Sequence, residues 1–343
     1  MMEERSDSFV IDGTQVGRSG SVYLIAEAGV AHFGSVDKAL ELVDMAADAH
    51  ADAVKFQIFK TTELISSRCG EWRQRMHPKE LPHAAFRDIQ RHCKTRGITF
   101  LATAHDEPSL DFLATLAPPA YKIGSGEVAN WPFLRRVGAL GKPVILSTGM
   151  YSLQQVGEAL TALAQGGTRD IAVLHCVTQY PTPPGDVNLK AMDAMRERYG
   201  VITGYSDHTA GMHVPLGAVG RGAAVIEKHI SLDFDIPDAQ DWRVSLDGPG
   251  LRLFVQQARE IAAALGEGDK RPTLEESERA VWARKSLVAA AAIECGEIIT
   301  AQKLCAKRPG DGISPSVIDE IIGKKTTVRI ECDAPITWEA LSP

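Results

Sequence analysis

VYLIAEAG (22–29), VDKALELVDMAADA (36–49) and AVKFQIF (53–59) are three consecutive stretches of the chain that establish its pattern. The first and the third are short runs rich in apolar and β-forming residues, whereas the second has the spacing of an amphipathic helix. Buried strands that alternate with helices are typical of a parallel sheet covered by helices. These stretches therefore predict a β–α–β unit near the start of the chain.

The same alternation continues to about residue 265. Further strand-like runs begin at Ile98, Ala120, Pro143, Ile171, Val201 and Ala223, and amphipathic patterns separate them. Eight such units in about 245 residues favour a closed (β/α)8 barrel over an open sheet. No GxGxxG sequence follows the first run, which argues against a dinucleotide-binding sheet. The predicted fold class is α/β, with a TIM barrel over residues 1–266.

The composition changes after Gly266. Residues 267–283 are polar and charged and predict a linker. Residues 284–343 predict a small α+β domain, with a strand–turn–strand over 286–300 and a short helix over 317–325. A module of about 60 residues is too small to hold a deep active site alone, so the chemistry is expected in the barrel.

Composition and charge narrow the class of protein. The chain has 44% hydrophobic and 24% charged residues, values typical of a soluble globular protein. Its net charge of −7 argues against nucleic acid or an anionic membrane as a partner. No apolar run approaches the roughly 20 residues of a membrane helix, no signal peptide is visible, and six cysteines form no CxxC pair. We expect a cytoplasmic protein with reduced thiols.

Polar residues lie at the end of every predicted strand. They are Glu27 and His32; Lys55 and Gln57; Thr103 and His105; Lys122, Ser125 and Glu127; Ser147 and Thr148; His175, Thr178 and Tyr180; Ser206, Asp207 and His208; and Glu227, Lys228 and His229. TIM-barrel enzymes build their active sites at these strand ends. A single buried charge could belong to a structural ion pair, since an unpaired one is costly. Polar ends on eight successive strands instead favour an active site.

Two groups of these residues indicate particular chemistry. Lys55, Lys122, Ser125, Ser147 and Thr148 supply the ammonium and hydroxyl groups that hold a phosphate and a carboxylate.

The second group is His208 and His229 on adjacent strands, with Glu227 and Asp207 expected nearby. Two imidazoles beside a carboxylate are typical of a divalent-metal site with open positions. The alternative is a pair of buried histidines hydrogen-bonded to their neighbours. His175 lies within a strand and is expected to be a structural histidine.

The motifs that surround these residues carry a family resemblance. They are, in order, IAEAG, KFQ, YKIGSGE, KPVILSTGM, LHCVTQYPTP, GYSDHT, IEKHISLD and KRPGDGISP, between about Tyr23 and Arg329. The chain resembles the sialic acid synthase family, which includes spore-coat-polysaccharide-type and other nonulosonate synthases. The resemblance implies a TIM barrel followed by an antifreeze-like (SAF) domain. It also implies a domain-swapped homodimer, in which the SAF domain of one subunit covers the barrel mouth of the other.

The resemblance further implies a reaction: metal-dependent condensation of phosphoenolpyruvate with a sugar aldehyde, which releases phosphate and gives a 2-keto-3-deoxy sugar acid for surface polysaccharides. His208 and His229 would hold Mn²⁺ or Mg²⁺. The residues implied around phosphoenolpyruvate are Lys55, Thr103, Lys122, Ser125, Ser147, Thr178, Tyr180 and Ser206. Those implied on the sugar side or at the reacting carbons are Glu27, Gln57, Glu227, Asp241 and, from the partner subunit's SAF domain, Arg308. Glu27, Lys55, Lys122 and Glu227 would be catalytic.

Three loops depart from the family's usual sequences. Ala31–Gly34 replaces Asn-His-Asn-Gly, Ala102–His105 replaces Ser-Thr-Pro-Phe, and Pro237–Asp241 replaces Pro-Gly-Pro-Asp and is followed by Trp242. These changes lie on the sugar side. They predict retained chemistry with an altered acceptor, either an N-acetylmannosamine-like sugar, a modified hexosamine or another aldose.

Two other functions remain open. A deoxy-octulosonate- or deoxy-heptulosonate-type synthase would also be a metal-using barrel, but the SAF-like module argues against it. A catalytically silent sugar-binding or regulatory homologue would have little reason to retain Glu27, Lys122, His208 and His229 together.

Overall fold

The computed structural model describes residues 7–17, 21–237, 239 and 241–343. These residues form two compact units, one ending at Glu267 and the other beginning at Gly268. Each unit is described by itself.

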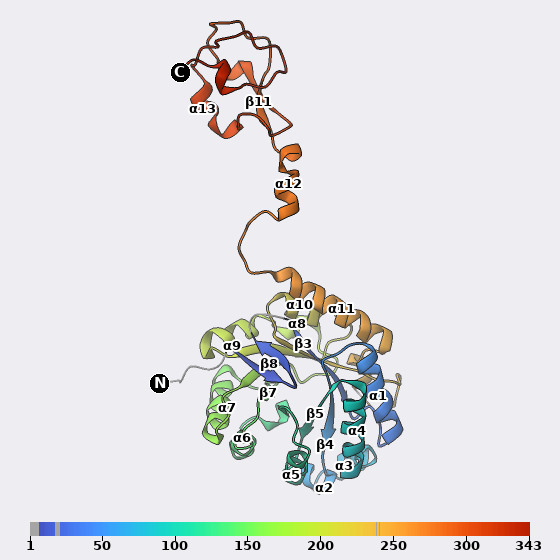
Figure 1. Ribbon diagram of the computed structural model, residues 1–343. Helices are drawn as coiled ribbons and strands as arrows, with labels where there is room; N and C mark the ends of the chain where they lie inside the picture. Colours follow the sequence, from blue (N-terminus) through green and yellow to red (C-terminus); the bar gives the residue numbers. More distant parts are fainter. Residues whose placement is uncertain (1–6, 18–20, 238, 240) are drawn as a thin grey trace. The chain divides into compact units, whose positions relative to one another are not determined.

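The first unit is a closed barrel of eight parallel strands surrounded by helices (Figure 1). Going round the barrel, the strands are β10 (Val225–His229), β3 (Tyr23–Gly29), β4 (Ala53–Ile58), β5 (Thr99–Ala104), β6 (Tyr121–Ile123), β7 (Val144–Ser147), β8 (Ile171–Cys176) and β9 (Ile202–Asp207). Each lies within one of the eight predicted runs. The predicted TIM barrel is confirmed.

The helices alternate with the strands, as predicted. The longer ones are α1 (Val36–Asp48), α4 (His83–Arg96), α5 (Glu107–Thr115), α6 (Trp131–Gly138), α7 (Leu153–Gly166), α9 (Ala191–Tyr199), α10 (His213–Gly220) and α11 (Gly248–Leu265). The short ones are α2 (Thr61–Leu64), α3 (Gly70–Met76), η1 (His77–Lys79), η2 (Ser125–Glu127), α8 (Pro184–Val187) and η3 (Asp241–Val244). Helices α6 and α7 pack through Gly138 and Gly166, where an added Cβ would lie within 2.3 Å of a carbonyl oxygen of the facing helix.

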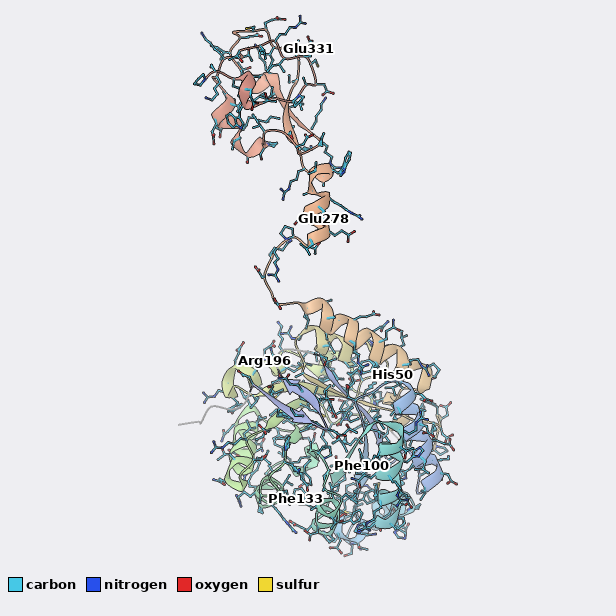
Figure 2. All side chains as sticks on the ribbon, in the orientation of Figure 1. His50, Phe100, Phe133, Arg196, Glu278 and Glu331 are labelled. Carbon is cyan, nitrogen blue, oxygen red and sulfur yellow. The ribbon has the colours of Figure 1, made fainter. Side chains whose placement is uncertain are left out.

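Side chains alternate between the inside of the barrel and the helical layer. In β10, Val225 belongs to the inner apolar cluster, whereas Ile226 packs in the outer cluster beneath the helices. Because successive residues of a strand point to opposite faces, Glu227 and His229 point inward with Val225. Inward-facing apolar side chains, among them Ile25, Leu101, Ile145 and Leu174, pack together inside the barrel, so it is not an open channel. Figure 2 draws the side chains on the ribbon.

A short hairpin closes the N-terminal end of the barrel. Strands β1 (Ser8–Ile11) and β2 (Thr14–Gly17) pair antiparallel. Phe9, Ile11 and Val16 pack against the inner apolar layer, which contains Ile25, Leu101, Ile145 and Leu174. The sequence analysis did not predict this hairpin. It leaves the opposite end of the barrel as the open one.

The second unit has its own hydrophobic core. Its elements are α12 (Leu274–Ala283), β11 (Ser286–Ala289), η4 (Ala301–Lys303), β12 (Leu304–Lys307), η5 (Pro315–Val317), α13 (Ile318–Ile321) and η6 (Trp338–Ala340). The core includes Leu287, Ile293, Leu304 and Ile336. The predicted strand–turn–strand over 286–300 was half right: β11 forms, but it pairs antiparallel with β12. The stretch predicted as a linker, 267–283, contains α12.

The hairpin provides a test of the fold. Ile11→Ala removes a side chain with no exposed area and should lower the free energy of unfolding by about 2–5 kcal/mol, because it leaves a cavity under the barrel. Val10→Ala, at a neighbouring position that is 57% exposed, should change it by about 0.5 kcal/mol or less. Urea unfolding of the full chain, followed by circular dichroism, measures both. Equal stability of the two variants would show that the hairpin does not complete the core.

Candidate active site

The C-terminal ends of the barrel strands enclose a cavity of about 170 Å³. The predicted site residues of the barrel that line it are Glu27, Lys55, Gln57, Thr103, Lys122, Ser125, Ser147, Thr178, Tyr180, Ser206, His208, Glu227 and His229. Asp241 and Thr148 do not, and the hydroxyl group of Thr148, predicted to help hold a phosphate, instead donates to the carbonyl oxygen of Leu174 at 2.8 Å. The lining residues come from every strand of the barrel or from the loop that follows it. Their chemical roles stay predictions, but the structure brings them to one place.

Two lysines and two glutamates form a chain of alternating charge across the floor of the cavity. Lys55 Nζ lies 2.7 Å from Glu27 Oε2 and 3.8 Å from Glu227 Oε2. Lys122 Nζ lies 3.5 Å from the same Glu227 oxygen. All four side chains are almost completely buried. Because each buried charge has an opposite charge beside it, the cluster is neutral in total and avoids an unpaired buried ion.

The surroundings push the pKa values of the two carboxyl groups apart. Burial raises the pKa of Glu27, and it outweighs the opposing effect of Lys55. Burial would also raise the pKa of Glu227, but Lys122 and Lys55 outweigh it and lower that pKa. Glu227 is therefore held ionised, whereas Glu27 is the carboxyl group better able to carry a proton.

The pKa values of the two lysines also move in opposite directions. Burial lowers the pKa of Lys122 more than Glu227 raises it. Burial also disfavours the charge on Lys55, but its two carboxylate neighbours, Glu227 and Glu27, raise the pKa overall.

Hydroxyl groups line the wall next to Lys122, and Gly149 packs against two of them. Lys122 Nζ donates a hydrogen bond to Ser147 Oγ at 2.7 Å. The backbone N–H of Gly149 donates to Ser125 Oγ at 2.9 Å. A Cβ at Gly149 would lie 2.2 Å from Thr178 Oγ1, so only glycine leaves room for both hydroxyl groups. Ammonium and hydroxyl groups converging in this way suit an anion such as a phosphate.

His208 and His229 face each other at the ends of β9 and β10. Their ring centroids lie 5.3 Å apart. His208 Nδ1 lies 2.6 Å from the carbonyl oxygen of Val177, which can only accept, so Nδ1 carries a hydrogen atom. In the neutral ring Nε2 is then an acceptor, and it lies 2.8 Å from the hydroxyl group of Tyr180. Burial lowers the pKa of His229 to about 3, which keeps that ring neutral.

Three other predictions near the site have different outcomes. Asp207 was expected close to the histidine pair; this was wrong, because it points to the outer face of β9 and forms an ion pair with Lys228 at 2.6 Å. His175 is a structural histidine, as predicted, since its Nε2 bonds the Val187 carbonyl at 2.6 Å. Asp241, in η3, does not line the cavity, but its charge acts on Tyr180 and His229.

Arg308 lies on an exposed stretch of the second unit, directly after β12.

Two further residues line the cavity: Cys176, which was not predicted, and His105, which was among the polar strand ends but was given no role. Cys176 is the last residue of β8, and its Sγ lies 3.7 Å from His208 Nδ1. His105 follows β5, and burial lowers its pKa to about 4. Cys176 could have been predicted from the alternation of β8. Ala172 and Leu174 point inward, and Cys176 follows Leu174 by two residues, so its side chain points inward as well.

The divergent segments lie at or after the C-terminal ends of β3, β5 and β10. Phe33, after β3, has a positive φ of 48° and lies under the ammonium group of Lys79. Trp242 is described, whereas Asp238 and Gln240 of the predicted acceptor loop lie outside the described residues.

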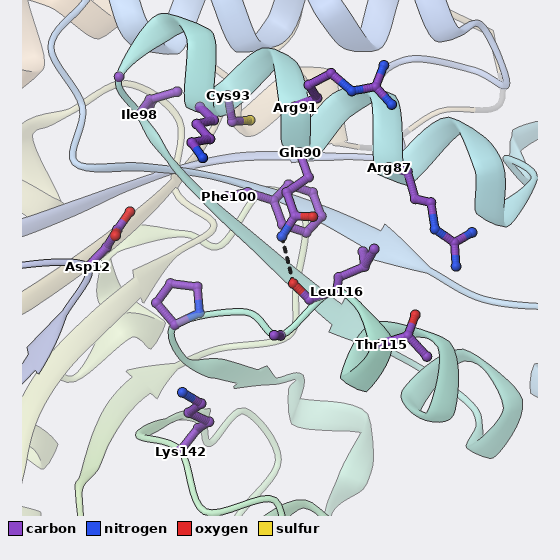
Figure 3. Close-up of a pocket in the computed structure, with 14 residues that line it drawn as sticks. Asp12, Arg87, Gln90, Arg91, Cys93, Ile98, Phe100, Thr115, Leu116 and Lys142 are labelled. Carbon is purple, nitrogen blue, oxygen red and sulfur yellow. Dashed lines mark hydrogen bonds between the residues drawn. The ribbon is translucent and has the colours of Figure 1, made fainter.

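A larger hollow, of about 940 Å³, lies away from these groups. It opens outside the barrel, between α4 and the loop that follows α5, with Asp12 and Lys142 on one side and Arg87 and Arg91 on the other (Figure 3). None of the predicted site residues lines it. The smaller cavity is therefore the candidate active site.

Comparisons with known proteins agree with this assignment. Residues 42–270 match the NeuB family, and residues 284–342 match the SAF domain. The chain belongs to the NeuB family. It is 40% identical over 325 residues to the N,N'-diacetyllegionaminic acid synthase of Campylobacter jejuni, covering 90% of this chain and 97% of that protein. The resemblance to sialic acid synthases is confirmed, and so is the prediction of an enzyme, a phosphoenolpyruvate-dependent synthase.

Solved structures of related proteins share both the sequence and the fold. The sialic acid synthetase of Leptospira borgpetersenii superposes with a TM-score of 0.75 at 32% identity, over 81% of this chain and 96% of that one. The spore coat polysaccharide biosynthesis protein SpsE of Bacillus subtilis superposes with a TM-score of 0.68 at 30% identity, over 98% and 99% of the two chains. The predicted C-terminal SAF domain is confirmed.

None of the helices formed by the described residues has the length and apolar character needed to cross a membrane.

The glycine at the cavity wall provides a test of the site. Gly149→Ala would force Thr178 and Ser125 apart and should raise the KM for phosphoenolpyruvate by about tenfold, as expected for the loss of one or two hydrogen bonds to an anion. Gly185→Ala places a methyl group where no atom lies within 4 Å and serves as the matched control. Steady-state kinetics and a melting curve of each variant separate binding from folding. An unchanged KM for phosphoenolpyruvate in Gly149→Ala would show that Ser125 and Thr178 do not contribute to binding the anion.

Proposed function

We propose that this protein condenses phosphoenolpyruvate with an amino-sugar-type aldose to form a 2-keto-3-deoxy sugar acid for a surface polysaccharide. The observation that carries the proposal is the placement of Lys55, Lys122, Glu27, Glu227 and the His208–His229 pair around one cavity. Relatives of the same family include an N,N'-diacetyllegionaminic acid synthase, which favours an amino-sugar acceptor. They also include a spore coat polysaccharide biosynthesis protein, which favours a role in making a surface polysaccharide.

Phosphoenolpyruvate would lie along the wall formed by β5 to β9, together with Lys55, which comes from β4 and donates a hydrogen bond to Thr103 Oγ1 on β5 at 3.1 Å. Lys55 and Lys122 supply two buried positive charges, and Ser125, Ser147 and Thr178 supply hydroxyl groups within reach of the same space. A compact anion with a phosphate and a carboxylate needs this combination of groups. Its anionic groups would compete with Glu27 and Glu227 for the lysines, so binding loosens the internal ion pairs.

The aldehyde would lie on the opposite side, near β10, β3 and β4. There Glu27 Oε1 accepts a hydrogen bond from Gln57 Nε2 at 2.9 Å, which leaves the other amide hydrogen of Gln57 for a sugar oxygen. Two of the three departures from the family pattern, Ala31–Gly34 and Pro237–Asp241, follow β3 and β10 on this side, whereas Ala102–His105 lies at β5. These two departures favour a changed acceptor side.

The histidine pair fits a divalent metal such as Mn²⁺ or Mg²⁺. Because Nδ1 of His208 bonds the Val177 carbonyl, a metal would be bound by Nε2 in place of its contact with Tyr180, and His229 is held neutral beside it. Among the described residues no three His, Cys, Asp or Glu side chains are placed to hold one metal ion, so these two imidazoles would be the protein's ligands, with positions left for water or substrate. When bound, the metal supplies Lewis-acid polarisation of the aldehyde carbonyl.

The two glutamates divide the proton transfers. In the reaction, C3 of phosphoenolpyruvate bonds to the aldehyde carbon, water adds at C2, and the bond from C2 to the phosphate oxygen breaks. Glu27, whose pKa burial raises, can donate a proton to the aldehyde oxygen. Glu227 is ionised, and its Oε2 atom accepts no hydrogen bond from the described residues, so it can take a proton from the attacking water.

The reaction itself is the first prediction of this proposal. Phosphate release from phosphoenolpyruvate should require both an aldose and a divalent metal. His208→Ala and His229→Ala should each reduce it by about a hundredfold or more, because the metal loses one of two protein ligands. The assay would use N-acetylmannosamine, its 6-phosphate, 2,4-diacetamido-hexoses and simple aldoses with Mn²⁺.

The matched control is His77→Ala, which removes a histidine whose side chain is 76% exposed. If the His208 and His229 variants release phosphate as fast as the parent protein, the metal assignment is wrong. If folded, metal-loaded protein binds phosphoenolpyruvate but releases no phosphate with any aldose, the catalytically silent homologue becomes the better interpretation. Turnover of aldose phosphates alone, with products of the octulosonate or heptulosonate type, would favour the deoxy-sugar-phosphate synthase.

We also propose that the protein acts as a homodimer, in which Arg308 of the partner subunit reaches the sugar. Large apolar side chains on the surface of the second unit support this proposal. Leu274 is 86% exposed and Trp282 is 77% exposed, and both lie on α12. Trp338 and Val328 add to the exposed apolar area of the same unit. Apolar surface of this kind is typical of a protein–protein contact.

Complementation between two inactive variants tests the dimer. Lys122→Ala and Arg308→Ala should each be nearly inactive alone. If Arg308 acts on the other subunit, co-expressed or mixed and reassembled proteins contain dimers with one intact site, and an equal mixture should recover about a quarter of the parent activity. Phosphate release per total subunit measures this. Absence of any recovery, with mixed dimers shown to be present, would exclude the exchange of Arg308 between subunits.

A further inference from the structure

A second hollow, of about 430 Å³, lies beside the active-site mouth. It is lined by Arg75, Asp235, Ile236, Pro237, Ala239, Trp242 and Arg243. These residues come from α3, which follows β4, and from the segment after β10 that includes η3. Both segments follow the C-terminal ends of strands, so the hollow belongs to the catalytic end of the barrel.

The hollow is on the acceptor side of that end. Strands β10 and β4 flank β3 on its two sides, and these three strands carry His229, Gln57 and Glu27. The backbone ties the segment of Trp242 and Arg243 to the end of β10, because the N–H of Leu246 donates to the carbonyl oxygen of His229 at 2.9 Å. We therefore place the far end of a sugar whose aldehyde lies beside Glu27 toward this segment.

The walls of the hollow are cationic and aromatic. Neither Arg75 nor Arg243 forms an ion pair with any carboxylate of the described residues. Trp242 is held in place by a hydrogen bond from its Nε1 to the carbonyl oxygen of Ile236 at 3.1 Å. The guanidinium group of Arg243 lies 5.4 Å from the centre of the indole ring, which orients it without neutralising it. One carboxylate, Asp235, shares the hollow.

We propose that Arg75 and Arg243, with Trp242 as the supporting surface, select an acceptor that carries an anionic group at the end remote from its aldehyde. This inference rests on the proposed function and specifies its acceptor class. A guanidinium group presents two parallel N–H donors that match a phosphate or a carboxylate. Two guanidinium groups without an ion-pair partner among the described residues would attract such a group, whereas a neutral hydroxymethyl end would offer them no charge to pair with.

Matched pairs of acceptors test the selection. The parent protein, with saturating phosphoenolpyruvate and Mn²⁺, is assayed for phosphate release with an N-acetylhexosamine, its 6-phosphate and the corresponding 6-carboxylate (uronic) form. The anionic forms should have the higher kcat/KM, and the better of the two identifies whether the group is a phosphate or a carboxylate. Arg243→Ala and Arg75→Ala should each raise the KM for the preferred anionic acceptor by about tenfold, the usual loss for one partly exposed charged hydrogen bond. The KM for phosphoenolpyruvate and the neutral acceptor should not change.

Two further variants control for charge and for folding. Asp235→Asn removes a carboxylate that lines the hollow and should lower the KM for the anionic acceptor, the opposite of the arginine variants. Arg91→Ala removes an exposed arginine at the hollow outside the barrel and should leave all kinetic constants unchanged. Opposite effects of Asp235→Asn and Arg243→Ala cannot come from a general loss of stability.

The outcomes separate this inference from the proposed function. If neutral acceptors react as well as anionic ones, and the arginine variants alter neither, the condensation stands and the anionic acceptor is excluded. If neutral acceptors are preferred, the inference is also overturned. If no aldose supports phosphate release in the parent protein, the proposed function fails first.

Discussion

The ion pair between Lys55 and Glu27, 2.7 Å apart in the barrel interior, is the contact on which the rest of the site depends. Neither charge would be stable there alone, because the cost of removing a single ion from water exceeds what packing can return. Glu227 and Lys122 extend the pair into a neutral group of four. Neutrality allows the barrel to hold a charged layer at one end, but such a layer adds little net stability. The apolar layer at the other end, completed by the hairpin residues Phe9, Ile11 and Val16, has to provide it.

The same neutrality prepares the cavity for an anion. An empty site with two unpaired lysines would be costly, whereas lysines already paired with carboxylates can exchange those partners for a phosphate or a carboxylate of the substrate. The displaced carboxylates can then transfer protons, because their pKa values differ. Burial raises the pKa of Glu27 and favours its protonated form, whereas Lys122 and Lys55 lower the pKa of Glu227 and favour its ionised form. The ion pairs that allow burial are therefore also the ones that set the acid and the base.

Much of the fold and most of the site could be predicted from the sequence because both follow from periodicity. Apolar runs separated by amphipathic helices determine a barrel, and polar residues at strand ends then converge at one mouth. The errors arose where the phase of a strand was ignored: Asp207 is one residue from the inward-facing His208 and therefore points outward to Lys228, whereas Cys176, in phase with Leu174, faces the cavity.

The hairpin was missed because four-residue strands carry almost no periodic signal. The 286–300 region was misassigned because β11 pairs with β12, about fifteen residues later, and local pattern does not specify a distant partner.

The division between strands and loops also explains two of the three departures from the family pattern; the third, Ala102–His105, lies mostly within β5. Lys55, Lys122, Ser206 and Glu227 lie on strands whose register is fixed by backbone hydrogen bonds to neighbours on both sides, so a shift of one residue would turn each side chain out of the cavity. Phe33, Arg75 and Trp242 lie on segments that follow the strands, where a substitution or an inserted residue leaves the barrel intact. Phosphoenolpyruvate, as the proposed common substrate, would be bound by the strands. The acceptor would be bound by segments free to change, and for that reason these two departures from the family pattern point to the acceptor and not to the reaction.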